Sequence, residues 1–144
     1  MPDLLDANVW LALSAPDHTH HTRARQYWDE QAAESTGFCR LTALALLRHL
    51  CAREIFGAAA LSGEAAWRSL QEWLALPAVH WWDEPAGLDE WLRQWSARVP
   101  LRGGDWTDAY LAAFAAASDR RLVTFDRGFR RFSGLDCLLL TTAP

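Results

Sequence analysis

Apolar and polar positions along the chain form blocks whose length and spacing predict strands and helices in alternation. Short apolar runs predict five strands, at residues 2–6, 35–40, 78–82, 121–126 and 135–140. Stretches with apolar residues three and four apart predict the helices, at residues 7–13, 18–31, 42–52, 62–75, 88–95 and 104–117. This alternation, without a long linker, predicts one α/β domain over residues 1–144, with a mainly parallel sheet covered by helices on both faces.

The predicted helix over residues 104–117 is the most apolar of these helices. Asp105 or Thr107 is placed to cap its first turn, and the run 109–117 is apolar on every side, so we expect the helix to be deeply buried. Asp108 stands at the start of this run. An acid in a first turn also stabilises a helix through its dipole alone, by up to about 1 kcal/mol, and this interpretation stays open.

Two further acids, Asp6 and Asp126, end predicted strands. In a parallel α/β fold, strand ends and a helix start meet at one sheet edge, so we expect both acids to lie near Asp108. Carboxylates about 4 Å apart repel by roughly 4 kcal/mol per pair, and a hard cation with oxygen ligands, Mg²⁺ or Mn²⁺, removes that repulsion. The alternative for Asp6 is a simple N-cap of the next helix.

Composition limits the other classes of function. The N-terminus lacks a signal-peptide pattern and the longest apolar run is too short to cross a bilayer, so we expect a cytoplasmic protein that does not enter a membrane. The three cysteines lack metal-type spacing and are expected to be reduced. Three nearby histidines invite a zinc hypothesis, but two are adjacent and point apart on a helix; they are His18, His20 and His21.

Charge is unevenly distributed along the chain. The net charge of −4 argues against a protein that coats nucleic acid indiscriminately, yet residues 98–131 carry seven Arg against four Asp. Three of these arginines follow Asp126 directly and predict contacts with RNA, with a solvated turn as the alternative: Arg127, Arg130 and Arg131. The chain also has nine tryptophans, more than one small core needs, and we expect some of them to face a protein partner.

Four segments, taken together, resemble a known family. They are 4–13 (LLDANVWLAL), 38–48 (FCRLTALALLR), 106–113 (WTDAYLAA) and 122–129 (LVTFDRGF). In order and spacing they are similar to the motifs of PIN-domain ribonucleases, and more narrowly to VapC toxins of type II toxin–antitoxin systems. The resemblance covers essentially the whole chain.

The resemblance implies a three-layer α/β/α sandwich and Mg²⁺- or Mn²⁺-dependent endoribonuclease activity. It also implies a cognate antitoxin as partner and a homodimer. By position, Asp6, Asp108 and Asp126 would be the catalytic metal ligands. Residues expected to support these carboxylates are Asn8, Thr42, Thr124 and Asp105.

The chain departs from the family pattern at one position. The family commonly has Glu one place after the equivalent of Thr42, whereas this chain has Ala43 in a helix whose expected packing stripe is Leu44, Leu47 and Leu50. Either three aspartates suffice, or Asp105 substitutes, or the activity is weakened or lost. A PIN module that only binds RNA or a protein therefore stays open. A phosphatase of small esters is disfavoured because Asn8 stands where that chemistry wants a second Asp.

Overall fold

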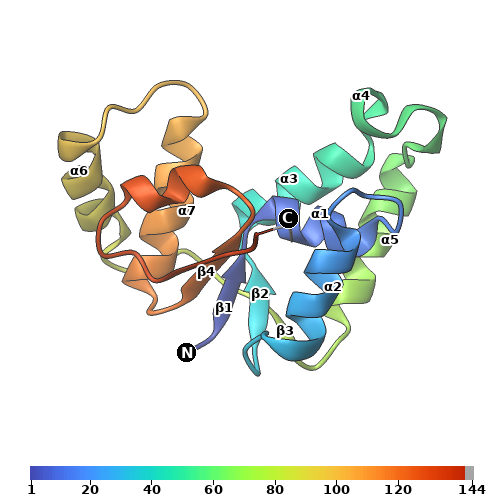
Figure 1. Ribbon diagram of the computed structural model, residues 1–144, viewed down its shortest axis with the longest axis horizontal. Helices are drawn as coiled ribbons and strands as arrows, with labels where there is room; N and C mark the ends of the chain where they lie inside the picture. The colour runs from blue at the N-terminus through green and yellow to red at the C-terminus, as the bar shows by residue number, and fades with distance from the viewer. Residues whose placement is uncertain (142–144) are drawn as a thin grey trace.

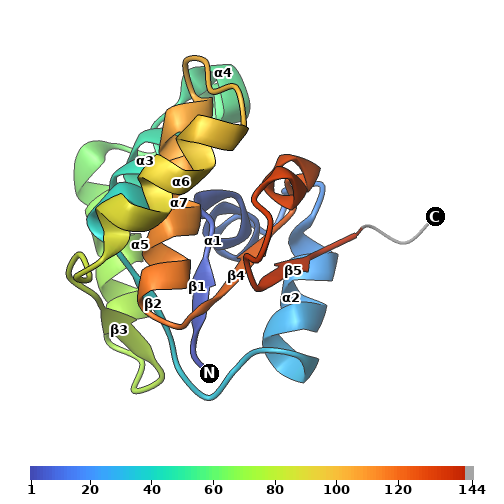
Figure 2. The ribbon, with the colours of Figure 1, turned by 90° about the vertical axis from the view of Figure 1, so that its left-hand side faces the viewer.

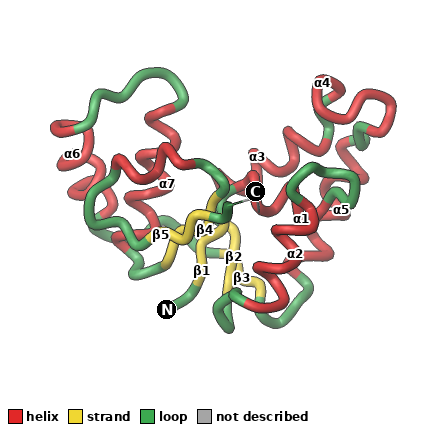
Figure 3. The backbone as a smooth tube through the Cα atoms, viewed as in Figure 1, coloured by secondary structure: helices red, strands yellow, loops and turns green. Residues whose placement is uncertain are grey.

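The computed structural model describes residues 1–141, and its centre is a sheet of five parallel strands. The strands run in the order β3-β2-β1-β4-β5, and all four pairings are parallel. Figure 3 shows them between two groups of helices. Their bounds are β1 Asp3–Leu5, β2 Thr36–Phe38, β3 Val79–Trp81, β4 Arg121–Thr124 and β5 Cys137–Leu139. The expected strands are therefore confirmed, each shorter than its apolar run.

Helices cover both faces of the sheet and give the expected three layers (Figure 1). One layer holds α1 (Ala7–Ser14), α2 (His21–Glu30), α3 (Arg40–Leu50) and α5 (Gly63–Leu74). The other holds α6 (Leu88–Arg98) and α7 (Asp105–Ala117). Three short elements were not expected as helices: α4 (Arg53–Phe56) and the 3₁₀ turns η1 (Gly57–Ala59) and η2 (Arg127–Arg131).

Successive residues of the central strands pack into two separate hydrophobic cores, one on each face of the sheet. Leu5 and Val123 point into the core beneath α1, α2, α3 and α5, while Leu4 and Leu122 point into the core beneath α6 and α7. This follows from the two-residue period of a strand, which sends successive side chains to opposite faces. The apolar run of α7 is buried as its composition predicts.

The amino edge of the sheet is held by a buried ion pair. Asp3 in β1 is fully buried and accepts hydrogen bonds from Arg121 Nε and Nη2 at 2.8 and 2.9 Å. The Tyr27 hydroxyl of α2 donates to the same carboxylate, and burial followed by this bond raises the pKa of Tyr27. The pair joins β1, β4 and α2, so its role is structural.

The opposite, carboxyl edge has a crevice at a predictable place. The chain builds β1, β2 and β3 outward in one direction and then crosses back to add β4 and β5 on the other side of β1 (Figure 2). The connections leaving β1 and β4 therefore diverge, which is where α/β sheets bind ligands. No helix within residues 1–141 is long and apolar enough to cross a membrane.

Candidate active site

A cavity of about 760 Å³ opens at the carboxyl ends of β1 and β4. Its walls come from the start of α1, one face of α3, the first turns of α7, and Asp126, which follows β4. Three acids line it, as the sequence predicts: Asp6, Asp108 and Asp126. The cavity also has an apolar and cationic wall on α3, described below.

Asp6 is held by two hydrogen bonds at the base of the cavity. Its Oδ1 accepts from the Ala7 amide at 2.7 Å, which caps α1, and its Oδ2 accepts from the Thr124 hydroxyl at 2.7 Å. Burial is the main reason that the pKa of Asp6 is raised to about 6, against the opposing effect of these bonds. The charges of Asp108 and Asp126 raise it further. Asp6 is therefore an N-cap and also part of an acidic group.

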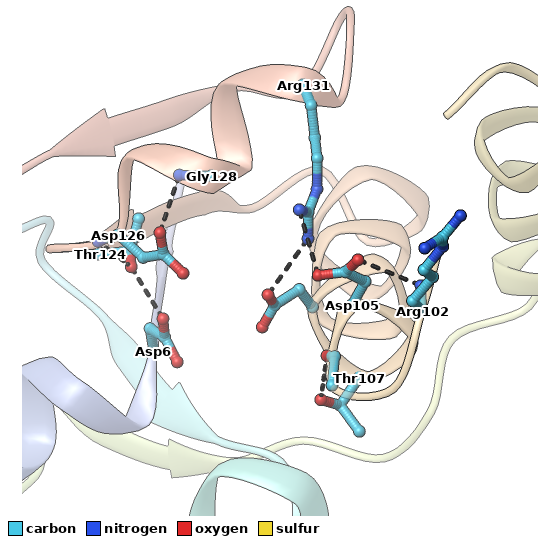
Figure 4. Close-up of polar contacts among 10 residues, drawn as sticks. Asp6, Arg102, Asp105, Thr107, Thr124, Asp126, Gly128 and Arg131 are labelled. Atoms are coloured by element: carbon cyan, nitrogen blue, oxygen red, sulfur yellow. Dashed lines mark hydrogen bonds and ion pairs between the residues drawn. The ribbon is translucent and has the colours of Figure 1, made fainter. Parts of the chain in front are cut away.

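Thr124 links the two strand-end acids (Figure 4). Its fully buried hydroxyl donates to Asp6 and accepts from the Asp126 amide at 3.0 Å. Asn8 adds long bonds of 3.4 Å, donating from Nδ2 to the same hydroxyl and accepting from the Phe125 amide at Oδ1. Thr124 therefore contacts the Asp6 carboxylate and the Asp126 backbone directly, while Asn8 reaches the acids only through Thr124 and the backbone.

Asp126 is fixed by the turn that follows it. Its Oδ1 accepts from the Gly128 amide at 2.8 Å, which caps η2. A Cβ atom at position 128 would lie 3.0 Å from that oxygen, closer than ordinary contacts allow, so a side chain there would displace the carboxylate.

Asp108 is paired with an arginine from η2. Arg131 Nη2 lies 3.2 Å from Asp108 Oδ2, and Arg131 Nη1 lies 3.3 Å from Asp105 Oδ1. Burial is the largest effect on Asp108 and raises its pKa, the charge of Asp126 raises it further, and Arg131 lowers it. Asp108 is thus more than a helix-dipole residue, because it shares an electrostatic environment with Asp126 and Arg131.

Asp105 and Thr107 do not cap α7 in the expected way. The N-cap is Gly104, and the Thr107 hydroxyl donates to the Gly104 carbonyl at 2.8 Å. Asp105 instead accepts from the Arg102 amide at 3.1 Å and pairs with Arg131 (Figure 4). Asp105 does not belong to the lining of the acid cavity, so its support of Asp108 is indirect, through the shared arginine.

The expected packing face of α3 is confirmed at Leu47 and Leu50 but wrong at Leu44. The helix begins at Arg40 with Cys39 as N-cap, and Thr42 lies in the first turn, where its hydroxyl accepts from the Cys39 amide at 3.1 Å. Ala43 is fully buried in the core, so a carboxylate at that position would not face the acids. Leu44, which was expected in the core, is 53% exposed and lines the cavity.

Sequence reasoning missed the cationic part of the α3 wall. Arg48 and His49 line the acid cavity together with Leu41, Leu44 and Ala45. Burial, followed by the charge of Arg48, lowers the pKa of His49, which favours a neutral imidazole at neutral pH. The available signal was the helical spacing of 41, 44, 45 and 48, which places these residues on one face.

The three arginines after Asp126 have different surroundings. Arg131 is occupied by Asp105 and Asp108. Arg127 is exposed and lines a separate cavity of about 120 Å³ with His20 and Phe125, whose rings stack at 4.6 Å. Arg130 is exposed on η2. The structure therefore does not bring these three side chains into one track.

The three acids are the kind of ligand that a hard cation prefers, but their side chains do not lie close enough together to hold one ion. All three side chains are carboxylates, which suit Mg²⁺ or Mn²⁺. The charges of Asp108 and Asp126 add to the raised pKa of Asp6, and the charge of Asp126 adds to that of Asp108, as repelling charges do. Within residues 1–141, no three Asp, Glu, His or Cys side chains come close enough to hold one metal ion. The Asp108 carboxylate is engaged with Arg131 instead.

Comparison with known proteins identifies the family. Residues 4–135 match the PIN domain family. Ribonuclease VapC41 of Mycobacterium tuberculosis is 36% identical over 95% of this chain and 97% of its own length, and Ribonuclease VapC29 of the same organism is 32% identical over 99% and 98%. The solved structure of VapBC2 from Rickettsia felis, bound to a promoter DNA fragment, shares the fold with a TM-score of 0.70, at 14% identity over 98% of this chain and 100% of that chain. The chain therefore belongs to the PIN-domain family, among the VapC ribonucleases.

Proposed function

We propose that this protein is a metal-dependent endoribonuclease that acts as the toxin of a VapBC-type pair. The observation that carries the proposal is the meeting of Asp6, Asp108 and Asp126 in one cavity at the switch point of the sheet. Repulsion among three carboxylates is costly to a fold, and Arg131 offsets it only at Asp108, so their grouping supports a cation site.

The chain's own residues would hold and orient the reacting groups. Each oxygen of Asp6 accepts one hydrogen bond and keeps a free lone pair, and Thr124 fixes Asp6 relative to Asp126. When bound, Mg²⁺ or Mn²⁺ would lower the pKa of a water and offset charge on the phosphate. Water attacks phosphorus and gives up a proton, the ester P–O bond breaks, and the departing oxygen takes up a proton, so that one water is added across the broken bond.

The binding-only alternative loses its motivating observation. It rested on Ala43 in place of an acid, and that residue lies in the core, away from the cavity. The relatives named VapC are ribonucleases, and the fold neighbour from Rickettsia felis is a VapBC pair. These support a cognate antitoxin as partner and RNA as substrate. A homodimer stays a prediction, for which the exposed tryptophans provide surface: Trp67, Trp81 and Trp106.

A cleavage assay tests the proposal. Purified protein is incubated with a mixed-sequence RNA in Mg²⁺, in Mn²⁺ and in excess EDTA, beside the variants Asp108→Asn and Asp29→Asn. Asp29 is an exposed residue of α2 paired with Arg25, so its variant controls for the loss of one charge. We expect cleavage by the wild type and Asp29→Asn in either metal, and none in EDTA or by Asp108→Asn. Cleavage that persists in EDTA, or in Asp108→Asn, would refute the assignment.

A further inference from the structure

One face of α3 forms a wall of the acid cavity and changes character along its length. Leu41, Leu44 and Ala45 are followed by Arg48, at the spacing that stacks residues on one side of a helix. The wall therefore presents an apolar patch and then a cation, in the same cavity as the three carboxylates.

Arg48 has no partner to neutralise it within residues 1–141. Its side chain is exposed and forms none of the hydrogen bonds or ion pairs found in that part of the chain, although three acids line the same cavity. By contrast, Arg131 is held by Asp105 and Asp108, and Arg127 lines a different cavity. Arg48 is the one arginine on the described cavity wall that is free to meet a ligand.

The chemistry of this wall fits a single-stranded nucleic acid. A guanidinium binds a phosphate through a planar pair of N–H donors, while an exposed apolar surface offers van der Waals contact to a base or a ribose. His49, next to Arg48 on the wall, has a buried Nδ1 without a partner within residues 1–141, and it adds no charge when neutral.

We infer that Arg48 is a phosphate-binding residue of the RNA track, and that it holds a phosphate flanking the one at the acids. The nucleoside between the two phosphates lies against the exposed surface of Leu44. This rests on the proposed ribonuclease function and adds a second anchoring point, on α3, to the arginines expected on η2. Arg48 binds substrate here and takes no part in the chemical step.

A binding experiment with a matched control tests the inference. A fluorescently labelled 20-nucleotide RNA of mixed sequence is titrated in EDTA, so that RNA stays intact, against the wild type, Arg48→Gln, Arg48→Lys and Arg93→Gln. Arg93 is an exposed residue of α6 outside the cavity lining, and its change removes the same charge. Circular dichroism and thermal unfolding show whether each variant is folded.

We expect Arg48→Gln to bind RNA about tenfold more weakly than wild type, since a charged hydrogen bond to phosphate is lost. Its slope of log affinity against log salt should be shallower by about 0.7, the value for one phosphate contact on a single strand. Arg48→Lys should fall between, because it keeps the charge and loses the paired donors. Arg93→Gln should match the wild type.

Several results separate this inference from the proposed function. Equal RNA affinity and equal salt slope in Arg48→Gln and Arg93→Gln would overturn the inference. So would a lower melting temperature of Arg48→Gln with unchanged RNA affinity, because that result is expected if the Arg48 charge only stabilises the end of α3. In Mg²⁺, the variant should show a raised KM with kcat kept. RNA binding that depends on Arg48 without cleavage by the wild type would support the inference and refute the nuclease; no RNA binding by the wild type would refute both.

Discussion

The raised pKa of Asp6 makes the stability of the metal-free protein depend on pH in a defined direction. Folding raises this pKa from 3.8 to about 6, so between these values the folded state binds a proton that the unfolded state has released. Stability therefore falls as pH rises through this window, and the loss stays at higher pH. The Asp6→Asn variant has no such proton and should lack this loss.

The magnitude follows from two opposing effects. A shift from 3.8 to about 6 corresponds to roughly 3 kcal/mol of destabilisation when Asp6 is ionised. The amide of Asp6→Asn has one oxygen and can accept from either Ala7 or Thr124, so one hydrogen bond is lost, at about 1 kcal/mol. We expect the variant to be more stable than wild type by about 2 kcal/mol near neutral pH.

The assay is urea unfolding in EDTA at several pH values. The stability difference between Asp6→Asn and wild type should shrink by about 2 kcal/mol between about pH 7.5 and about pH 4.5, because Asp6 gains its proton in the folded state. The exposed Asp29→Asn serves as control and should show no such change. A difference between Asp6→Asn and wild type that stays constant with pH would refute the reasoning.

Three other changes have expected outcomes. Arg131→Met frees Asp108 from a partly exposed ion pair worth about 0.5–1 kcal/mol, so calorimetric titration should show Mn²⁺ binding roughly two- to fivefold tighter; weaker binding would contradict this. Ala43→Glu places a carboxylate in the core and should lower the free energy of unfolding by several kcal/mol. Ala45→Glu places it on the cavity wall, so this variant should fold and bind Mn²⁺ more tightly than wild type. Similar free energies of unfolding for the two variants would show that α3 is oriented otherwise. Arg121→Gln leaves Asp3 buried without its ion pair and should cost about 3–5 kcal/mol in urea unfolding, and a loss below about 1 kcal/mol would be inconsistent with this role.

Local pattern was enough to predict most of the fold and the three acids. Apolar runs bounded by polar residues predicted the strands, and Asp6 and Asp126 follow β1 and β4 because polar side chains take over where each buried strand ends. The parallel alternation then brings those ends to one edge with the start of α7, which is a general property of this topology.

The orientation of α3 could not be read from the sequence, because leucines occur on more than one of its faces. Leu46 and Leu50 are buried against the core while Leu44 lines the cavity, and the choice depends on how α1 and α5 pack around the helix. An apolar stripe alone does not decide between such faces. The family pattern, and not this stripe, connected Ala43 with the site, while placing Leu44 in the core hid the cavity face that carries Arg48.

The pairing of Arg131 was also beyond local pattern. Its partners Asp105 and Asp108 lie more than twenty residues earlier, at the start of another helix. Their meeting depends on where η2 lies over the start of α7. Long-range ion pairs of this kind have no sequence period, so the sequence predicts a contact with RNA for Arg131 and does not indicate this pairing.

Anomalous diffraction from crystals grown with Mn²⁺ tests the central claim most directly, because it locates the metal without reference to activity. We expect a Mn²⁺ peak in the cavity at the carboxyl ends of β1 and β4, within direct coordination distance of Asp6, Asp108 and Asp126. Crystals that bind Mn²⁺ elsewhere, or that show no peak in this cavity at saturating Mn²⁺, would contradict it.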